Sequence, residues 1–257
     1  MSRAVLLRDR LRRYYTTYYR DVLGIPDWPA LVKLREVEEQ QERGRLERLR
    51  RVLGGALRGR LLNVGCGTGG FNVAAEEAGV RAVGVDADPE AVAICALKRE
   101  KAGGAFVRAA AERLPFPDAT FDVVYCFSAI EHVESVDETV AEMVRVARPG
   151  GLVYVHTPNA WSWYEGHYKL LWAPFLPQPL GRLYLRLRGR PSAYLATLRR
   201  LTPTALRRAF ARVGVRDLRF HDDAPPRESL GPLRAPIGLY YRLSGVSPFI
   251  ELVARKP

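Results

Sequence analysis

The 257-residue sequence lacks the features that mark membrane-spanning and secreted proteins. No apolar run approaches the roughly 18–20 residues that a spanning helix needs. The stretch Ala4–Leu7 is too short for the core of a signal peptide. The three cysteines, at 66, 95 and 126, are widely spaced and form no CxxC pair. We therefore expect a cytoplasmic protein with reduced thiols, either free in the cytoplasm or peripheral to the inner face of the membrane.

Lysine is also scarce, because it supplies only five of the 40 basic residues, and arginine supplies the rest. The formal net charge of +12 is unevenly distributed along the chain. Residues 1–60 carry +7, residues 61–156 carry −6 and residues 157–257 carry +11. Basic ends can attract a protein to anionic surfaces without identifying which surface. We expect no nucleic-acid partner, and the sequence leaves the oligomeric state open.

The middle of the chain alternates strand-like and helix-like segments. Short apolar runs occur at 61–64, 82–85, 105–107, 121–127 and 152–155. Helical stretches separate them at 71–78, 89–101 and 136–147, the last with a capping-box start at Ser135 and Glu138. Near-continuous apolar strands that alternate with helices predict a mostly parallel sheet with helices on both faces, an α/β fold.

We interpret the whole chain as one domain with four parts. Residues 1–57 are expected to form a helical N-terminal cap, with a second helix from about 31 to 53 lying exposed on the core. Residues 58–157 form the ligand-binding core. Residues 158–200, rich in tryptophan, tyrosine and proline, form a lid inserted after the fifth strand. Residues 201–257 close the fold with a helix at 203–210 and strands at 215–220 and 249–254.

A glycine-rich loop follows the first strand, in the segment LLNVGCGTGGF at 61–71. Glycines let the backbone approach a ligand closely, and the following helix N-terminus favours negative charge. Gly65, Gly67 and Gly70 fit the G-x-G-x-x-G spacing of dinucleotide sites, whereas Gly65, Gly67 and Gly69 fit the G-x-G-x-G loop for S-adenosylmethionine (SAM). The glycines alone do not choose between these ligands. Asp86, at the end of the second strand, suits the ribose hydroxyls of either one.

The order of further motifs resembles the class I SAM-dependent methyltransferases. Besides the glycine loop, the resemblance rests on VGVDADPEAV at 83–92, AAERLPFP at 110–117 before FDVV, and ARPGG at 147–151. It implies a Rossmann-like sheet with an antiparallel last strand, SAM as cofactor and methyl transfer as activity. The cofactor-binding positions that it implies are Asn63, Gly65, Cys66, Gly67, Gly69, Asp86, Ala87, Ala111, Glu112 and Phe127.

Two positions depart from the family pattern. Asn63 stands where the family usually has an acid, which removes a negative charge near the sulfonium. Ala110 stands where an aspartate often contacts the adenine, so that contact is expected from the backbone of Ala111 or from Glu112.

The catalytic candidates are Glu131 and His132, after the fourth strand, and His167 in the lid. Glu131-His132-Val133 resembles the ubiquinone-type O-methyltransferases, and the ordinary pKa of histidine suits a base for a hydroxyl acceptor. Some members of that group bind a metal through Glu-x-x-Glu-His, but Ser128 replaces the first Glu here. We therefore predict no dedicated metal site.

The predicted function is methyl transfer from SAM to a small-molecule acceptor, at a hydroxyl oxygen. One alternative is an NAD-dependent oxidoreductase. Another is a basic lipid- or RNA-associated protein with an inactive methyltransferase fold. The acceptor is expected to be hydrophobic or sugar-linked, for example a quinone precursor. The segment 168–190 is a lid with its aromatic residues facing inward, or a site of peripheral membrane contact.

Overall fold

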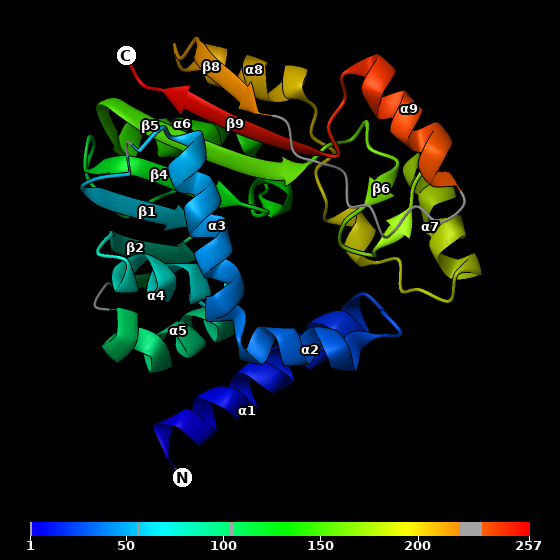
Figure 1. Cartoon of the computed structure of the whole chain (residues 1–257), viewed down its shortest axis with the longest axis horizontal. Helices are drawn as coiled ribbons and strands as arrows, with labels where there is room; N and C mark the ends of the chain where they lie inside the picture. The colour runs from blue at the N-terminus through cyan, green and yellow to red at the C-terminus, as the bar shows by residue number, and fades with distance from the viewer. Residues whose placement is uncertain (1, 56, 103–104, 222–232) are drawn as a thin grey trace.

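A seven-stranded sheet, built around apolar strand residues, forms the core of the molecule (Figure 1). The computed structural model describes residues 2–55, 57–102, 105–221 and 233–257. The strands run in the order β3-β2-β1-β4-β5-β9-β8, with β1 to β5 parallel and β9 antiparallel to both of its neighbours. Their bounds are β1 Arg60–Val64, β2 Arg81–Asp86, β3 Phe106–Arg108, β4 Phe121–Phe127, β5 Ala147–Pro158, β8 Asp217–His221 and β9 Phe249–Arg255. The predicted class I methyltransferase topology, with its antiparallel last strand, is confirmed.

Two helical layers cover the sheet. On one face, α3 (Glu38–Val52) and α4 (Gly70–Glu77) pack against side chains of β1, β4 and β9. On the other face, α6 (Val136–Val146) and α8 (Pro203–Arg212) cover a second apolar cluster. The helix α5 (Pro89–Ala102) follows β2 and contacts β3. Burial on both faces explains the apolar runs of the central strands, such as Val123–Cys126 in β4.

Side-chain caps fix where these helices begin. Ser135 Oγ accepts a hydrogen bond from the Glu138 backbone N–H, and Thr202 Oγ1 accepts one from Ala205. The second arm of the predicted capping box is replaced, because the backbone N–H of Ser135 donates to the carboxylate of Glu112. Each cap satisfies a backbone donor that the helix itself leaves without a partner.

The N-terminal cap differs from its prediction in one respect. It consists of α1 (Arg3–Thr16), a π-helical turn η1 (Thr17–Val22), α2 (Trp28–Glu36) and α3. The predicted single helix over 31–53 is wrong, because the chain leaves the helical region at Val37, with φ −121° and ψ 30°. The break turns one face of α3 toward the sheet, so that this helix is not the exposed helix that its mixed charges suggested. Its residues Leu46 and Leu49 are buried.

The lid and a further helix lie beyond the carboxyl ends of the strands. The lid contains a hairpin of β6 (Tyr164–Glu165) and β7 (Leu170–Leu171), then α7 (Gln178–Leu187) and a 3-10 turn, η3 (Tyr194–Ala196). Before β9 the chain forms α9 (Arg234–Ser244), which the sequence analysis missed. It packs through Ile237 and Tyr241 against Trp163 and Leu171 of the lid. In the described parts of the chain, no helix is both long and apolar enough to cross a bilayer.

Candidate functional site

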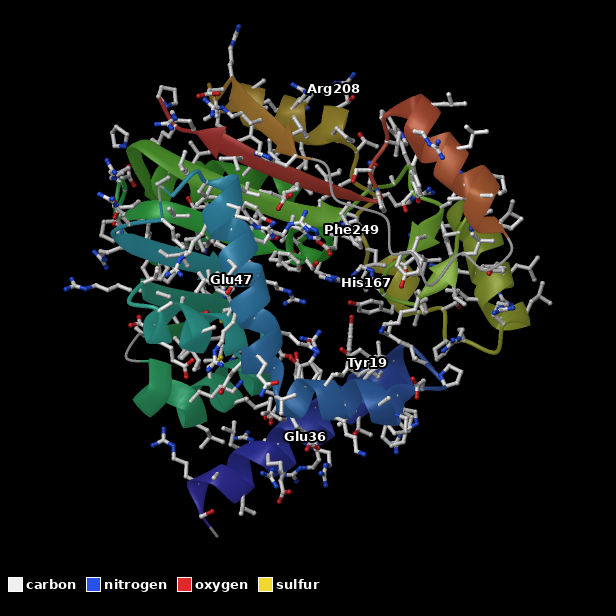
Figure 2. The ribbon with its side chains drawn as sticks, in the orientation of Figure 1. Tyr19, Glu36, Glu47, His167, Arg208 and Phe249 are labelled. Carbon is white, nitrogen blue, oxygen red and sulfur yellow. The ribbon has the colours of Figure 1, made fainter. Side chains whose placement is uncertain are left out.

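A cavity of about 510 Å³ opens where β1 and β4 end. Its wall comes from three parts of the chain: the glycine loop with the strand ends, the N-terminal cap and the lid. In Figure 2, Tyr19 of the cap, His167 of the lid and Phe249 of β9 lie around this space. Cavities of this size at the carboxyl ends of parallel strands are typical small-molecule sites.

The glycine loop forms the floor of the cavity and is built for close approach. Gly65 has φ +72°, and a Cβ there would lie 2.2 Å from the Cβ of Ala129. Gly67 has φ +52°, but a Cβ there would meet no atom within 4 Å. The backbone at Gly67 therefore borders open space into which any larger residue would project. An open cradle of this kind fits a ligand that lies directly on the main chain.

Asp86 holds this loop in place. Its Oδ2 accepts a hydrogen bond of 2.7 Å from the backbone N–H of Gly67, and its Oδ1 accepts one of 2.9 Å from Asp88. Burial raises the pKa of Asp86 above its ordinary value, although these backbone donors act against the rise. Asp88 in turn caps α5, because its Oδ1 accepts a hydrogen bond of 2.8 Å from the backbone N–H of Glu90. The ribose role of Asp86 stays a prediction.

The structure divides the other predicted cofactor positions into two groups. Asn63, Cys66 and Phe127 line the cavity together with Gly65 and Gly67. The remaining residues lie outside its lining: Gly69, Asp86, Ala87, Ala111 and Glu112. The carboxylate of Glu112 accepts backbone hydrogen bonds from Glu134 and Ser135 at the start of α6. Its predicted adenine contact would therefore compete with a helix-capping role.

Two buried glutamates of α3 were missed by the sequence analysis. Glu38 is in contact with Thr68, Tyr15 and the buried Lys98 of α5. Glu42, one helical turn later, also lines the cavity and pairs with Arg45 at 2.5 Å. Burial raises the pKa of Glu42 above its ordinary value, and Arg45 acts in the opposite direction. These carboxylates place negative charge in the cavity wall, whereas Asn63, where the family usually has an acid, is neutral.

The only sequence signal for these glutamates was their spacing of four residues. That spacing places Glu38 and Glu42 on one side of a helix without showing that this side is buried. Mixed charges on a helix usually mean a solvated surface. A charged side that faces a ligand cavity produces the same pattern.

The predicted catalytic residues come together, with His132 and His167 in the cavity lining. Glu131 is buried within the 3-10 turn η2 (Ile130–His132), and its Oε2 accepts a hydrogen bond of 2.9 Å from Thr157 Oγ1. Its Oε1 lies 3.6 Å from His167 Nε2 and 4.0 Å from His132 Nε2. Glu165, on the lid hairpin, contacts the other nitrogen of His167 at 2.8 Å. A carboxylate thus lies on each side of His167.

These contacts give the two histidines opposite protonation states. Burial lowers the pKa of His167, but its contacts with Glu131 and Glu165 outweigh burial and raise the pKa to about 10. Partial burial lowers the pKa of His132 below its ordinary value, and the charge on His167 acts in the same direction, against Glu131. Near neutral pH, His167 is therefore an imidazolium, whereas His132 is neutral and able to accept a proton.

Two tyrosines complete this wall of the cavity. The hydroxyl of Tyr194, in the 3-10 turn η3, lies 3.5 Å from each ring nitrogen of His132. The same hydroxyl lies 3.1 Å from that of Tyr18 in the N-terminal cap. The sequence analysis did not identify Tyr18 as a site residue. The repeated tyrosines of the cap therefore face the site as well as the core.

Glu131, His132 and His167 also form a group with metal-ligating side chains. One ligand atom from each lies within 4.8 Å of the others. The sequence analysis considered only Glu131 and His132 as metal ligands, and His167 of the lid is the third possible ligand. The three side chains could surround a divalent cation only if His167 lost its proton. Addition of EDTA to the activity assay therefore tests whether a metal takes part.

Comparison with known proteins agrees with this geometry. A family profile described as "Methyltransferase domain" matches residues 62–155, which include the glycine loop, Asp86 and the catalytic candidates Glu131 and His132 that follow β4. Residues 62–155 are a methyltransferase domain. This domain supplies the floor of the cavity, and the cap and lid around it lie outside the matched segment.

Curated relatives match the methyltransferase domain but little else. An uncharacterized methyltransferase of Mycobacterium leprae is 42% identical over 93 residues, covering 36% of this chain and 35% of that protein. Norajmaline N-methyltransferase of Rauvolfia serpentina is 38% identical over 115 residues, covering 40% and 39%. The match thus spans little more than a third of these relatives' length.

Structural comparison extends the similarity to the whole fold. A SAM-dependent methyltransferase from Archaeoglobus fulgidus superposes with a TM-score of 0.55 at 18% identity, covering 83% of this chain and 94% of that one. The predicted Rossmann-like fold is confirmed. The predicted family agrees with the profile match over residues 62–155. Closeness to the ubiquinone-type O-methyltransferases stays a prediction.

Proposed function

We propose that the protein transfers a methyl group from SAM to a hydroxyl oxygen of a small molecule. The observation that carries this proposal is that the glycine loop, His132 and His167 line one cavity, with the buried Glu131 in contact with His167. A donor on the loop and an acceptor beside His132 would therefore share one enclosed space. Holding two reactants in this way can be worth effective molarities of about 10⁵ M or more.

The residues on the cavity floor fit SAM. The open space at Gly67 fits a ligand that contacts the main chain. Asp86, the last residue of β2, accepts a hydrogen bond from the backbone N–H of Gly67. The methionine part of SAM is zwitterionic, and the sulfonium adds a further positive charge. Glu42 of α3 offers a buried carboxylate to these cations, while Arg35 and Arg45 line the same cavity and suit the carboxylate. When bound, SAM supplies an electrophilic methyl group.

The chain's own residues then have separate tasks. His132 removes the hydroxyl proton, because its lowered pKa keeps it neutral near pH 7. Glu131 holds His167 in place where the acceptor would bind, because its carboxylate contacts both His167 and Thr157. The His167 imidazolium lines the cavity and can donate a hydrogen bond to an acceptor oxygen that becomes more negative.

The alternatives are less well supported. An NAD-dependent oxidoreductase rests only on the spacing of Gly65, Gly67 and Gly70, and a Cβ on Gly70 would collide with Glu38 rather than border a ligand. A nitrogen acceptor has one supporting observation, the named activity of the Rauvolfia relative. A nitrogen acceptor that reacts as the free amine needs no base comparable to His132. The hydrophobic or sugar-linked acceptor and the cytoplasmic location belong to the same proposal.

Turnover of methyl-labelled SAM with pooled hydroxyl and amine acceptors tests the function. His132→Ala should lower turnover of a hydroxyl acceptor by about 10²–10⁴-fold, because the base is removed. Its affinity for S-adenosylhomocysteine (SAH), measured by calorimetry, should stay nearly constant. Wild-type turnover in the variant, or labelling of amines alone, would contradict the hydroxyl assignment. A loss of activity on addition of EDTA would replace base catalysis with a metal-assisted mechanism.

A further inference from the structure

Helix α7 has two apolar sides, and only one of them faces the protein. Gly181 and Leu185 are buried, with Gly181 close to the Trp172 ring. Leu180, Leu183 and Leu187 are 53%, 49% and 77% exposed. Their spacing of three and four residues places them on one side of the helix. This second side forms an exposed leucine stripe that packing against the lid does not explain.

Helix α9 also has one apolar side that packs on the lid and exposed leucines elsewhere. In α9, Ile237 and Tyr241 pack on the lid, while Leu239 and Leu243 are 49% and 79% exposed. Both helices lie at the edge of the molecule away from the sheet (Figure 1). Exposed apolar side chains that gather in this way mark interaction surfaces rather than ordinary surface composition.

Charge around the stripe narrows the choice of partner. No aspartate or glutamate occurs anywhere in residues 166–216. Arg182, Arg186 and Arg188 of α7 and its end are exposed, as is Arg242 of α9. Two copies of the chain that met through α7 would bring these arginines together, which disfavours self-association. Apolar side chains bordered by cations match the interface of a bilayer with anionic headgroups.

We propose that α7, with α9 beside it, docks the protein on the surface of an anionic phospholipid bilayer. Leu180, Leu183 and Leu187 enter the headgroup boundary, and the arginines contact the headgroup phosphates. The sequence analysis considered membrane contact for the segment 168–190 as a whole, and the structure shows which of its apolar residues are exposed. Trp172 is buried and Leu176 packs on the inner cluster, whereas Phe175, just before α7, is exposed.

The same surface lies close to the candidate site. A smaller cavity of about 70 Å³ is lined by Glu131 and His167 and also by Leu176 and by Gln178, the first residue of α7. Its lining includes Trp172 and several leucines. An acceptor with an apolar tail could therefore approach the site from the docked side. The docking itself requires neither SAM nor turnover and does not depend on the proposed activity.

Flotation of the full-length protein with vesicles tests the docking. Phosphatidylcholine vesicles are compared with and without phosphatidylglycerol, at low and at raised salt. Wild type should bind the anionic vesicles, and salt should release it. Leu183→Ser/Leu187→Ser should lower the partition coefficient by about tenfold or more, and Arg182→Gln/Arg186→Gln by a similar factor. Circular dichroism checks that each variant is folded.

Matched controls distinguish vesicle binding through α7 from nonspecific hydrophobic or electrostatic binding. Val5→Ser/Val37→Ser removes two apolar side chains from the N-terminal cap, each 47% exposed and so comparable with Leu183. Arg8→Gln/Arg13→Gln removes two charges from exposed positions on α1. Both controls should bind as wild type does. Three results would overturn the proposal: binding that ignores anionic lipid, equal losses in controls and α7 variants, or a wild-type dimer that Leu183→Ser/Leu187→Ser dissociates.

Discussion

His132 and His167 show how neighbouring side chains of one type acquire different chemistry. Their ring centroids are 5.1 Å apart. His167 lies between two carboxylates and holds its proton, whereas His132 is 31% exposed and 4.0 Å from the nearer carboxylate oxygen. The cation on His167 makes a second proton on His132 less favourable. Only the neutral histidine can then act as a base near pH 7.

The pH dependence of turnover tests this difference. His132 must be neutral to accept a proton, and its pKa lies below the ordinary value of about 6.5. The rate constant should therefore be flat from neutrality down to about pH 6.5 and fall only at lower pH. Steady-state rates measured across this range at saturating SAM give the profile. An inflection at or above pH 7 that His132→Ala abolishes would show that the pKa of His132 is not lowered.

At the scale of elements, α3 connects the N-terminal cap to the methyltransferase domain. Its first turn is held by Glu38, which contacts Thr68 of the glycine loop and Lys98 of α5. Its later turns place Leu46 and Leu49 against β1 and β4. Since Glu38 reaches the loop, movement of the cap would disturb the cavity floor. Cap and loop therefore act as one structural unit.

Removing the partner of Glu38 should destabilise the protein strongly. Lys98→Met leaves a buried carboxylate without its cation, which typically costs about 3–5 kcal/mol in the free energy of unfolding. The double variant Glu38→Gln/Lys98→Met should lose clearly less, because no buried charge remains. Arg43→Gln breaks an exposed pair between α3 and Glu77 of α4 and should cost less than about 1 kcal/mol. Urea unfolding measures all three, and a loss in Lys98→Met no larger than in Arg43→Gln would contradict this role of Glu38.

Local patterns predicted most elements of the core, and their failures have physical causes. Strand β4 was placed correctly over Phe121–Phe127, because residues 123–127 form an apolar run that ends at Ser128. The break at Val37 was missed, because no glycine or proline marks it. Helix α9 was missed because Pro236 and Gly238 are typical of loops, and its stability comes from Ile237 and Tyr241 packing on the lid.

At the scale of the whole molecule, the cavity joins segments that are far apart in sequence. Tyr18, Glu42, Gly67, His132 and His167 all line it, although about 150 residues separate the first from the last. The sequence identified Gly67, His132 and His167, because their residue types are unusual at these places. Tyr18 and Glu42 were not identifiable, because their position depends on how the cap folds over the strand ends.

The central claim is that the glycine loop and the cap together form a SAM site. Isothermal titration of the full chain with SAH and with NADH tests it most directly. Gly67→Ala places a methyl group in the open cradle, and Gly79→Ala is its control. Gly79 also has a positive φ, +77°, and free space around a Cβ, but it lies at the end of α4 outside the cavity lining.

Both alanine variants should pay a similar conformational cost of about 1–2 kcal/mol in stability. Wild type and Gly79→Ala should bind one SAH per chain with similar affinity, Gly67→Ala should bind it at least about tenfold more weakly, and none should bind NADH. Binding of NADH by wild type, or equal SAH affinity in Gly67→Ala and Gly79→Ala, would contradict the account.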